Sequence, residues 1–127
     1  MNLIFGNSIS MSSKSLEFLW AKQLTIANNL SNVDTPGYKS KYVTFEEAYQ
    51  NRLKLARATG NASRTRSIID NSFYTVNETE SSARLDENNV NADAEEVEMA
   101  RAQLQYQYVL NAINSDFSRL RGVIRGQ

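Results

Sequence analysis

The sequence of 127 residues contains no cysteine, no histidine and a single proline. Without cysteine it has neither disulfides nor thiolate metal sites, and without histidine it lacks the commonest catalytic base. It contains no apolar run of about 18 residues, so no segment is predicted to cross a membrane. The N-terminal stretch lacks a basic region followed by an apolar one, so we expect no cleaved signal peptide.

Neither sign of charge is in excess, since 14 Lys and Arg residues balance 14 Asp and Glu residues. Nucleic-acid-binding domains usually carry a basic excess, whereas here only Arg119, Arg121 and Arg125 cluster, and they suit the negative end of a helix dipole. The acidic pairs 46–47 and 95–96 would diverge by about 100° on a helix, so neither forms a catalytic pair. We predict no enzymatic activity, no cofactor, no metal and no nucleic-acid partner.

The first patterned segment predicts a helix over about residues 9–34. Its apolar residues recur in heptad rows, as in a helix that pairs with another along a seam, and Trp20, Leu24 and Ala27 widen the stripe. Pro36–Gly37 suits the centre of a type II turn over residues 35–38. The seam residues are Leu16, Leu19, Ile26, Leu30 and Val33.

A second helix is predicted over about residues 93–124. Asp93 is the expected N-cap, with Glu96 three residues on, and Gly126 is the expected stop. Such a helix would be roughly 48 Å long, which exceeds the width of a compact domain of this size. Its seam residues are Met99, Tyr106, Leu110, Ile113, Phe117, Leu120 and Ile124, and a second apolar stripe contains Val97, Ala100, Leu104 and Tyr108.

The middle, residues 39–91, is more polar. A short helix is predicted over Phe45–Ala58, with Thr44 and Glu47 as a capping box. Residues 59–91 are rich in Thr, Asn, Ser, Glu and Asp, so we expect a loop or a small appendage, disordered without a partner. Within this stretch only residues 73–76 have strand character.

Together these patterns predict a mainly α protein with one elongated domain over residues 1–127. Its long N- and C-terminal helices would pair as a coiled-coil-like hairpin, with a polar, partly irregular middle segment. The wide stripes leave apolar surface that one pairing cannot cover, and such surface normally marks a protein interface. A self-assembling structural subunit and a small coiled-coil adaptor both fit this description.

Residues 27–39 read ANNLSNVDTPGYK, in which short polar side chains end a helix and set a turn. This string closely resembles the N-terminal signature of the flagellar axial proteins, which are the rod, hook and hook-associated subunits. The resemblance implies terminal helices that pair and pack in a helical tube. The matching residues are Ala27, Asn28, Asn29, Leu30, Ser31, Asn32, Thr35, Pro36, Gly37 and Tyr38.

Within that family the chain resembles the short proximal rod proteins of the basal body, which form two sister branches. The stretch DENNVNADAEEVEMA at residues 86–100 resembles the family's lead-in D-G-N-N-V-x-x-D, with Glu87 in place of the glycine. The resemblance implies a subunit of the cell-envelope rod that connects the motor to the hook. Its partners would be other copies of itself and neighbouring rod and basal-body proteins.

The resemblance also implies an export route. Rod proteins of this family leave the cell through the flagellar type III apparatus without a cleaved signal, and early substrates carry a Phe-x-x-x-apolar motif for the export gate. Phe5 and Ile9 match that motif. The alternative is that these two side chains pack on the first helix or on a neighbouring element.

Overall fold

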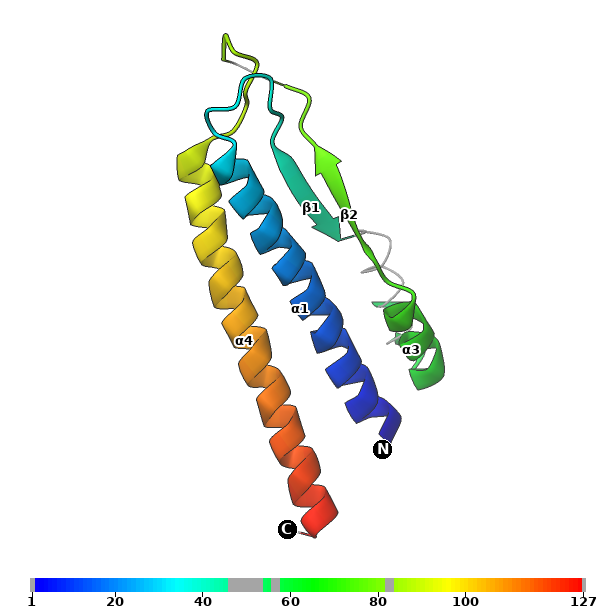
Figure 1. Cartoon of the computed structure of the whole chain (residues 1–127). Helices are drawn as coiled ribbons and strands as arrows, with labels where there is room; N and C mark the ends of the chain where they lie inside the picture. Colours follow the sequence, from blue (N-terminus) through cyan, green and yellow to red (C-terminus); the bar gives the residue numbers. More distant parts are fainter. Residues whose placement is uncertain (1, 46–53, 56–57, 82–83, 127) are drawn as a thin grey trace.

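The computed structural model describes residues 2–45, 54–55, 58–81 and 84–126. Two long helices, α1 (Asn2–Ser31) and α4 (Ala92–Arg125), run antiparallel along the molecule (Figure 1). Ser8 Oγ donates to Asp116 Oδ2 at 2.8 Å near one end, and Lys22 Nζ donates to Glu98 Oε2 at 3.0 Å toward the other. The predicted pairing of the terminal helices is therefore confirmed.

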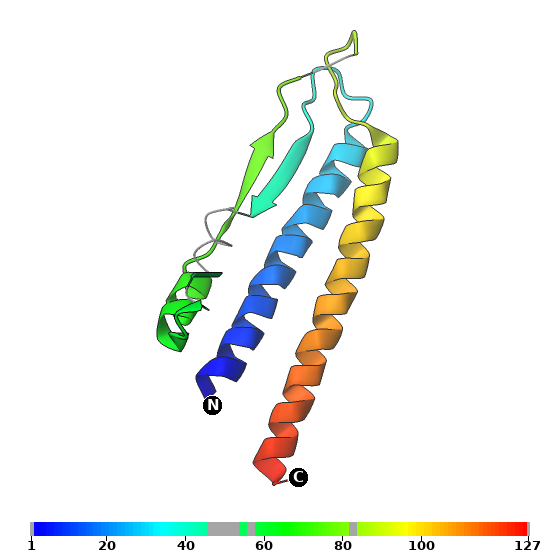
Figure 2. The same ribbon diagram turned by 180° about the vertical axis from the view of Figure 1, so that it is seen from behind.

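A two-stranded hairpin and a short helix cover another side of α1, so that α1 lies between them and α4 (Figures 1 and 2). Strand β1 (Lys41–Phe45) pairs antiparallel with β2 (Tyr74–Glu78), with Val43 opposite Val76. Helix α3 (Ala62–Asp70) lies beside the first half of α1. The rings of Phe18 and Phe45 meet edge to face at 5.3 Å and join α1 to the hairpin.

The buried core is thin. Leu19 and Ile26 of α1, with Ala102 and Ile113 of α4, are buried where the long helices pair. Ile69 of α3 is buried in a separate small cluster, against Met11, Phe45 and Ile68. Because so little apolar surface is enclosed, polar contacts contribute much of what holds the elements in place.

Helix α1 differs from its predicted bounds at both ends. It begins at Asn2, because α3 supports its first turns: Asn7 Nδ2 donates to Ala62 O at 2.9 Å, and Arg66 Nη1 donates to Gly6 O at 3.2 Å. It ends at Ser31, because the Asn32 side chain donates to Asn28 O at 2.8 Å where the helix would otherwise continue. Val33 therefore lies on the following turn and not on the helix.

The predicted cap of the last helix was wrong by two residues. Asn91 is the N-cap of α4, since its side chain accepts from Ala94 N at 3.2 Å, and Asp93 lies in the first turn. At the other end Gly126 adopts a left-handed conformation, with φ 73°, and ends the helix as expected.

The middle is more ordered than predicted, since residues 59–91 include α3 and β2. Asn61 caps α3 by accepting from Arg64 N at 3.0 Å, and Ile69 anchors it, so the loop interpretation was wrong there. Phe45 ends β1 and does not begin a helix, while Thr44 bonds Thr75 across the hairpin. Residues 54–55 and 58 of that predicted helix are helical, and its remaining residues, 46–53 and 56–57, lie outside the described part of the chain.

Candidate functional site at the junction of two sequence motifs

The segment after α1 and the segment before α4 meet at one end of the molecule. Their backbones bond directly, with Gly37 N donating to Asp86 O at 2.7 Å and Asn89 N donating to Tyr38 O at 3.4 Å. We call this region, residues 29–41 and 84–95, the junction. It brings together both motifs that carry the family resemblance, although about 50 residues separate them in the sequence.

Asn29 is the centre of the junction, and its side chain is completely buried. Its amide Nδ2 donates to Lys41 O at 2.7 Å, to Glu95 Oε1 at 3.1 Å and to Ser40 Oγ at 3.2 Å. Its Oδ1 accepts from Lys41 N at 2.9 Å and from the Tyr38 hydroxyl at 3.1 Å. One amide thus connects α1, β1 and α4. Removing the Asn29 side chain would take a partner from several polar groups, and this is costly in free energy because the site is buried.

Asn88 is the second fully buried amide. It lies on the segment before α4 and bonds the turn that follows α1. Its Nδ2 donates to Asn32 O at 2.8 Å and to Thr35 O at 2.9 Å, while its Oδ1 accepts from Val90 N at 2.8 Å. Asn88, four residues before α4, therefore adds a side-chain hydrogen bond to two backbone carbonyl groups of the turn that follows α1.

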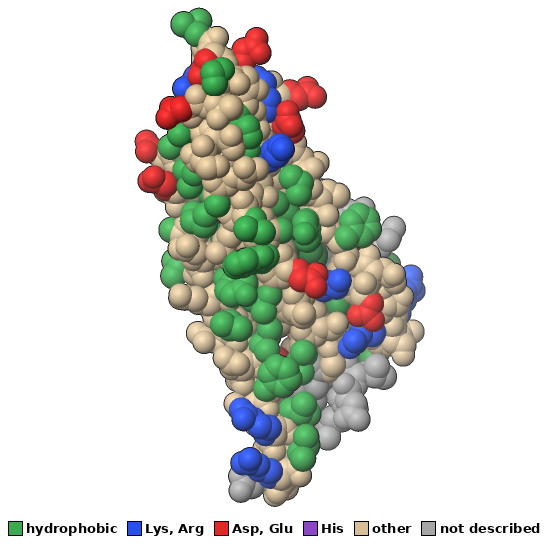
Figure 3. Space-filling view, viewed as in Figure 1, with side chains coloured by type: hydrophobic (Ala, Val, Ile, Leu, Met, Phe, Trp, Pro, Cys, Tyr) green, Lys and Arg blue, Asp and Glu red, His purple; other side chains and the backbone are tan. Residues whose placement is uncertain are grey.

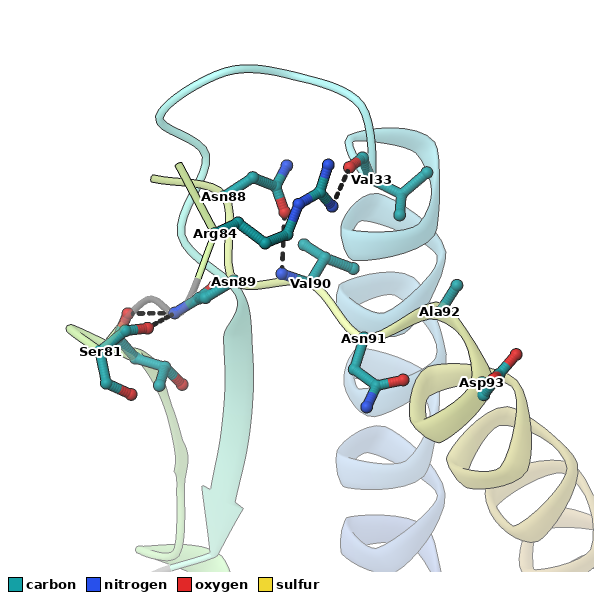
Figure 4. Close-up of a pocket in the computed structure, with 10 residues that line it drawn as sticks. Val33, Ser81, Arg84, Asn88, Asn89, Val90, Asn91, Ala92 and Asp93 are labelled. Carbon is teal, nitrogen blue, oxygen red and sulfur yellow. Dashed lines mark hydrogen bonds between the residues drawn. The ribbon is translucent and has the colours of Figure 1, made fainter. Parts of the chain in front are cut away.

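An open hollow of about 620 Å³ lies beside this amide (Figure 4). Arg84 Nη1 donates to Val33 O at 3.0 Å across it, and Asn89 Nδ2 points away to donate to Ser81 O at 2.6 Å. The side chains of Arg84 and Asn89 are thus engaged with other residues of its lining. Among the residues that the structure describes, no cluster of three or more His, Cys, Asp or Glu residues could hold a metal ion.

The turn over residues 35–38 has the geometry that Pro36–Gly37 predicts. Tyr38 N donates to Thr35 O at 3.2 Å, and Gly37 has a φ of 74°. Both features belong to a type II turn with glycine at its third position. Pro36 itself is exposed, so it acts through its fixed φ and not through burial.

Replacing Gly37 with valine is expected to destabilise the junction by about 1–2 kcal/mol, because a β-branched residue is strained at positive φ. A Cβ at this position would have no heavy atom within 4 Å, so steric crowding contributes little. Gly37→Asn is the matched control, since asparagine tolerates this conformation. Chemical unfolding monitored by circular dichroism measures the difference, and equal stability of the two variants would contradict the turn assignment.

Glu87 occupies the position where the family motif has glycine, and it has a φ of 61°. Among the described residues it is the only non-glycine residue with positive φ. The turn is therefore kept despite the substitution, at a cost in backbone strain. The Glu87 carbonyl accepts from Lys39 Nζ at 2.6 Å, and this contact holds the strained residue in place.

Glu87→Gly is accordingly expected to stabilise the protein by roughly 0.5–1 kcal/mol, since the relieved strain exceeds the added entropy of the unfolded chain. The Lys39 contact involves the backbone and survives the change. Glu80→Gly, at an exposed residue without positive φ, should be neutral or destabilising. The midpoint of thermal unfolding distinguishes the two variants, and a lower midpoint for Glu87→Gly would rule out strain at this residue.

Two ionisable groups around the junction have shifted pKa values. Burial, together with the negative charges of Glu95 and Glu78, raises the pKa of Tyr38, so its hydroxyl stays protonated and can donate to Asn29. A hydrogen bond from Lys22, and the charge of that lysine, lower the pKa of Glu98, so this carboxylate stays ionised. Both shifts favour the charge states that the observed contacts require.

The structure separates the predicted motif residues into two groups. Asn29, Asn32, Thr35, Gly37 and Tyr38 form the junction, through the bonds given above and a bond from Thr35 Oγ1 to Asn32 Oδ1 at 3.1 Å. The side chains of Ala27, Asn28 and Pro36 are exposed, and Leu30 is half-buried. Sequence reasoning missed the structural roles of Ser40, Asn88, Asn89 and Glu95, although the polar run before α4 was the available clue.

The predicted seam residues also divide. Leu19, Ile26 and Ile113 are buried inside the subunit, whereas Leu110, Phe117 and Ile124 are exposed. The half-buried members are Leu16, Leu30, Val33, Met99, Tyr106 and Leu120. Some of the seam residues therefore pack inside the subunit, and others lie on its surface.

Exposed apolar side chains run along both long helices (Figure 3). Trp20 on α1 is 56% exposed, and Leu104 and Tyr108 on α4 are 68% and 76% exposed. Phe18 and Leu19 face the latter pair across an open groove of about 500 Å³. The wide stripes seen in the sequence thus remain uncovered after the helices pair, as expected.

The two residues of the predicted export motif both belong to α1. Ile9 is half-buried, and the structure describes only the backbone of Phe5. In the part of the chain that the structure covers, none of the helices combines the length and apolarity needed to span a membrane.

Comparisons with known proteins find relatives of this sequence. A family model described as flagella basal body rod protein matches residues 20–39, which contain the end of α1 and the turn. The chain is 30% identical over 125 residues to the flagellar basal body rod protein FlgB of Bacillus subtilis (strain 168), covering 97% of each chain. It is 28% identical over 133 residues to the FlgB of Borrelia hermsii, covering 96% of this chain and 98% of that relative.

The chain therefore belongs to the flagellar basal body rod proteins, a family of structural proteins. Both relatives are FlgB proteins, so within the family the chain is most like FlgB. Neither relative is the sister protein FlgC, and nothing in the structure favours an unrelated adaptor.

Proposed function

We propose that this chain is a structural subunit of the proximal rod, which assembles through its terminal helices into the drive-shaft between the membrane-embedded motor and the hook. Its similarity to FlgB over nearly the whole chain carries this proposal. The structure adds a physical reason, because both long helices keep apolar side chains exposed after pairing. Burying such surface between subunits would stabilise an assembly by roughly 25 cal/mol per Å².

In this proposal the protein is not an enzyme. The central groups of the junction are asparagine amides and backbone groups, which neither take up nor release protons near neutral pH. Their role is to fix the positions of α1, β1 and α4. The proposed partners are other copies of the chain and neighbouring rod and basal-body proteins, with neither nucleic acid nor insertion into a membrane.

We further propose that the flagellar type III export gate recognises Phe5 and Ile9, and that the chain reaches the periplasmic rod without a cleaved signal peptide. The contacts of α3 with Gly6 and Asn7 would have to open before this segment could be presented as an extended chain. They are few and partly exposed to solvent, so they would open readily.

Deletion and complementation of the gene test the proposed rod function. A deletion strain should grow normally but build no hooks, filaments or complete rods, as judged by swimming and by electron microscopy of basal bodies. Expression of the intact chain should restore all three. A deletion strain that still swims would show that the chain is not a required rod subunit.

A further inference from the structure

The first turns of α1 have little helical stability of their own. Residues 2–10 read NLIFGNSIS, in which one glycine, two asparagines and two serines are poor helix formers, and the first turn contains no acidic residue. A short helical segment of this composition is marginal in water. Contacts with other elements must therefore keep these turns helical.

Helix α3 supplies such contacts along one side (Figure 1). Arg66 Nη1 donates to Gly6 O at 3.2 Å, and Arg66 Nε pairs with Asp70 Oδ2 at 2.9 Å. Asp70 in turn accepts from Ser10 Oγ at 3.4 Å. Two residues one turn apart on α3 thus hold two residues one turn apart on α1. We call α3, together with the α1 residues that it contacts, the clasp; those α1 residues are Gly6, Asn7, Ser10 and Met11.

The clasp has a single strong apolar anchor. Ile69 is 1% exposed and packs against Met11, and Thr65 is the only other described residue of α3 that is buried. On the α4 side, Ser8 Oγ donates to Asp116 Oδ2 in an exposed hydrogen bond. Because so few groups hold α3 and the first turns of α1, this region belongs to the least stable part of the fold.

Asn7 adds a cost to the closed clasp. Its side chain is nine-tenths buried, and its Nδ2 donates to Ala62 O at 2.9 Å. Its Oδ1, however, is buried and accepts no hydrogen bond from any residue that the structure describes. A buried acceptor without a partner costs free energy, and water can satisfy it once the clasp opens. Opening therefore recovers part of what closing costs.

We infer that α3 is a clasp that opens as a unit and releases the first turns of α1, while the rest of α1 stays paired with α4, and that Asn7 sets how readily it opens. The use of this opening rests on the proposed function, in which Phe5 and Ile9 must be presented to the export gate. The closed clasp holds these residues in a helix, and the open clasp frees them as an extended chain.

Amide hydrogen exchange tests whether the clasp opens separately. Ile69→Ala should accelerate exchange at residues 6–11 by at least about tenfold, since truncating a buried isoleucine has a large cost, and leave residues 16–25 unchanged. Ile26→Ala is the matched control, because Ile26 is buried in the other half of α1, and it should leave residues 6–11 unchanged. Equal acceleration along all of α1 by Ile69→Ala, or none at residues 6–11, would overturn the inference.

Two substitutions of similar size then test Asn7 in opposite directions. Asn7→Leu removes the unpaired acceptor and should slow exchange at residues 6–11 at least about threefold. Asn7→Asp replaces the donor by a second acceptor and should accelerate it by a similar factor. Ser13→Leu controls for helix propensity, since Ser13 is exposed on the same helix, and it should change exchange at residues 6–11 less than about twofold. Faster exchange in Asn7→Leu than in the wild type would show that Asn7 tightens the clasp, against the inference.

Secretion separates this inference from the proposed function. At matched expression, Asn7→Leu should lower the amount of chain that leaves the cytoplasm at least about threefold, in proportion to the lost open population. Asn7→Leu/Ile69→Ala should restore it, which shows that the effect acts through the clasp and not through a contact of residue 7 with the gate.

If Asn7→Leu slows exchange but secretion is unchanged, while the deletion strain still builds no rods, the rod function stands and control of export by the clasp is wrong. If exchange and secretion respond as expected but the deletion strain swims, the clasp stands and the rod function fails.

Discussion

Asn29→Ala is expected to destabilise the protein by about 3–4 kcal/mol, which is a large effect for one side chain. Five hydrogen bonds disappear, and the half-buried groups that they satisfied, among them Lys41 N and Glu95 Oε1, lose a partner. The cavity left by the amide adds to this cost. Urea unfolding followed by circular dichroism measures the loss, and faster amide exchange at Lys41 would locate it at the junction.

Asn28→Ala is the matched control, because the same residue type occupies the neighbouring position on α1 with its side chain exposed. It should cost less than about 0.5 kcal/mol. The adjacent motif asparagines thus differ in consequence because the Asn29 side chain is buried in the junction, whereas the Asn28 side chain is exposed and its Oδ1 accepts from Asn32 Nδ2 at 3.1 Å. Similar unfolding midpoints for the two variants would show that Asn29 does not hold the junction together.

Leu104→Gln/Tyr108→Gln is expected to abolish swimming while leaving the subunit folded. Both side chains are exposed in the isolated chain, so their loss removes little internal packing, and glutamine keeps helix propensity high. In an assembled rod each buried side chain would contribute about 1.5–3 kcal/mol, and this loss would recur in every subunit. Far-ultraviolet circular dichroism of the purified chain and motility at matched expression measure the two properties.

Gln107→Ala serves as the control for that experiment, since Gln107 is an exposed polar residue on the same helix. It should swim like the wild type. A buried counterpart, Ile113→Ala, should instead lower stability by roughly 2–4 kcal/mol, because its side chain packs inside the subunit. Normal motility of Leu104→Gln/Tyr108→Gln would mean that the apolar surface beside the groove is not an assembly interface.

The long helices could be predicted from sequence because their determinants are local and repeat many times. Heptad spacing, Pro36 and Gly126 are visible within short windows, and their meaning does not depend on the rest of the fold. Exact ends were missed where a distant element decides them. The contacts of Gly6 and Asn7 with α3 extend α1 toward its N-terminus, and no feature of the first ten residues predicts those contacts.

The middle was harder to predict because its order depends on single contacts. Helix α3 is short and polar, and it is held by one buried isoleucine, Ile69, together with an asparagine cap at Asn61. Strand β1 forms only because β2 pairs with it some 30 residues later, and Phe45 packs on Phe18. Periodicity gives little information about elements that one or two long-range contacts stabilise.

The sequence by itself determined the class of protein: two paired terminal helices, a turn at Pro36–Gly37, apolar stripes too wide for one pairing, and a motif that identifies the family. Only the tertiary structure decided which motif residues are buried and hydrogen-bonded to distant parts of the chain. It placed Asn29 and Asn88 in a buried network and left the Asn28 side chain exposed. The reason is that burial and hydrogen bonding depend on neighbours across about 50 residues, whereas periodicity and turn chemistry act within about a dozen.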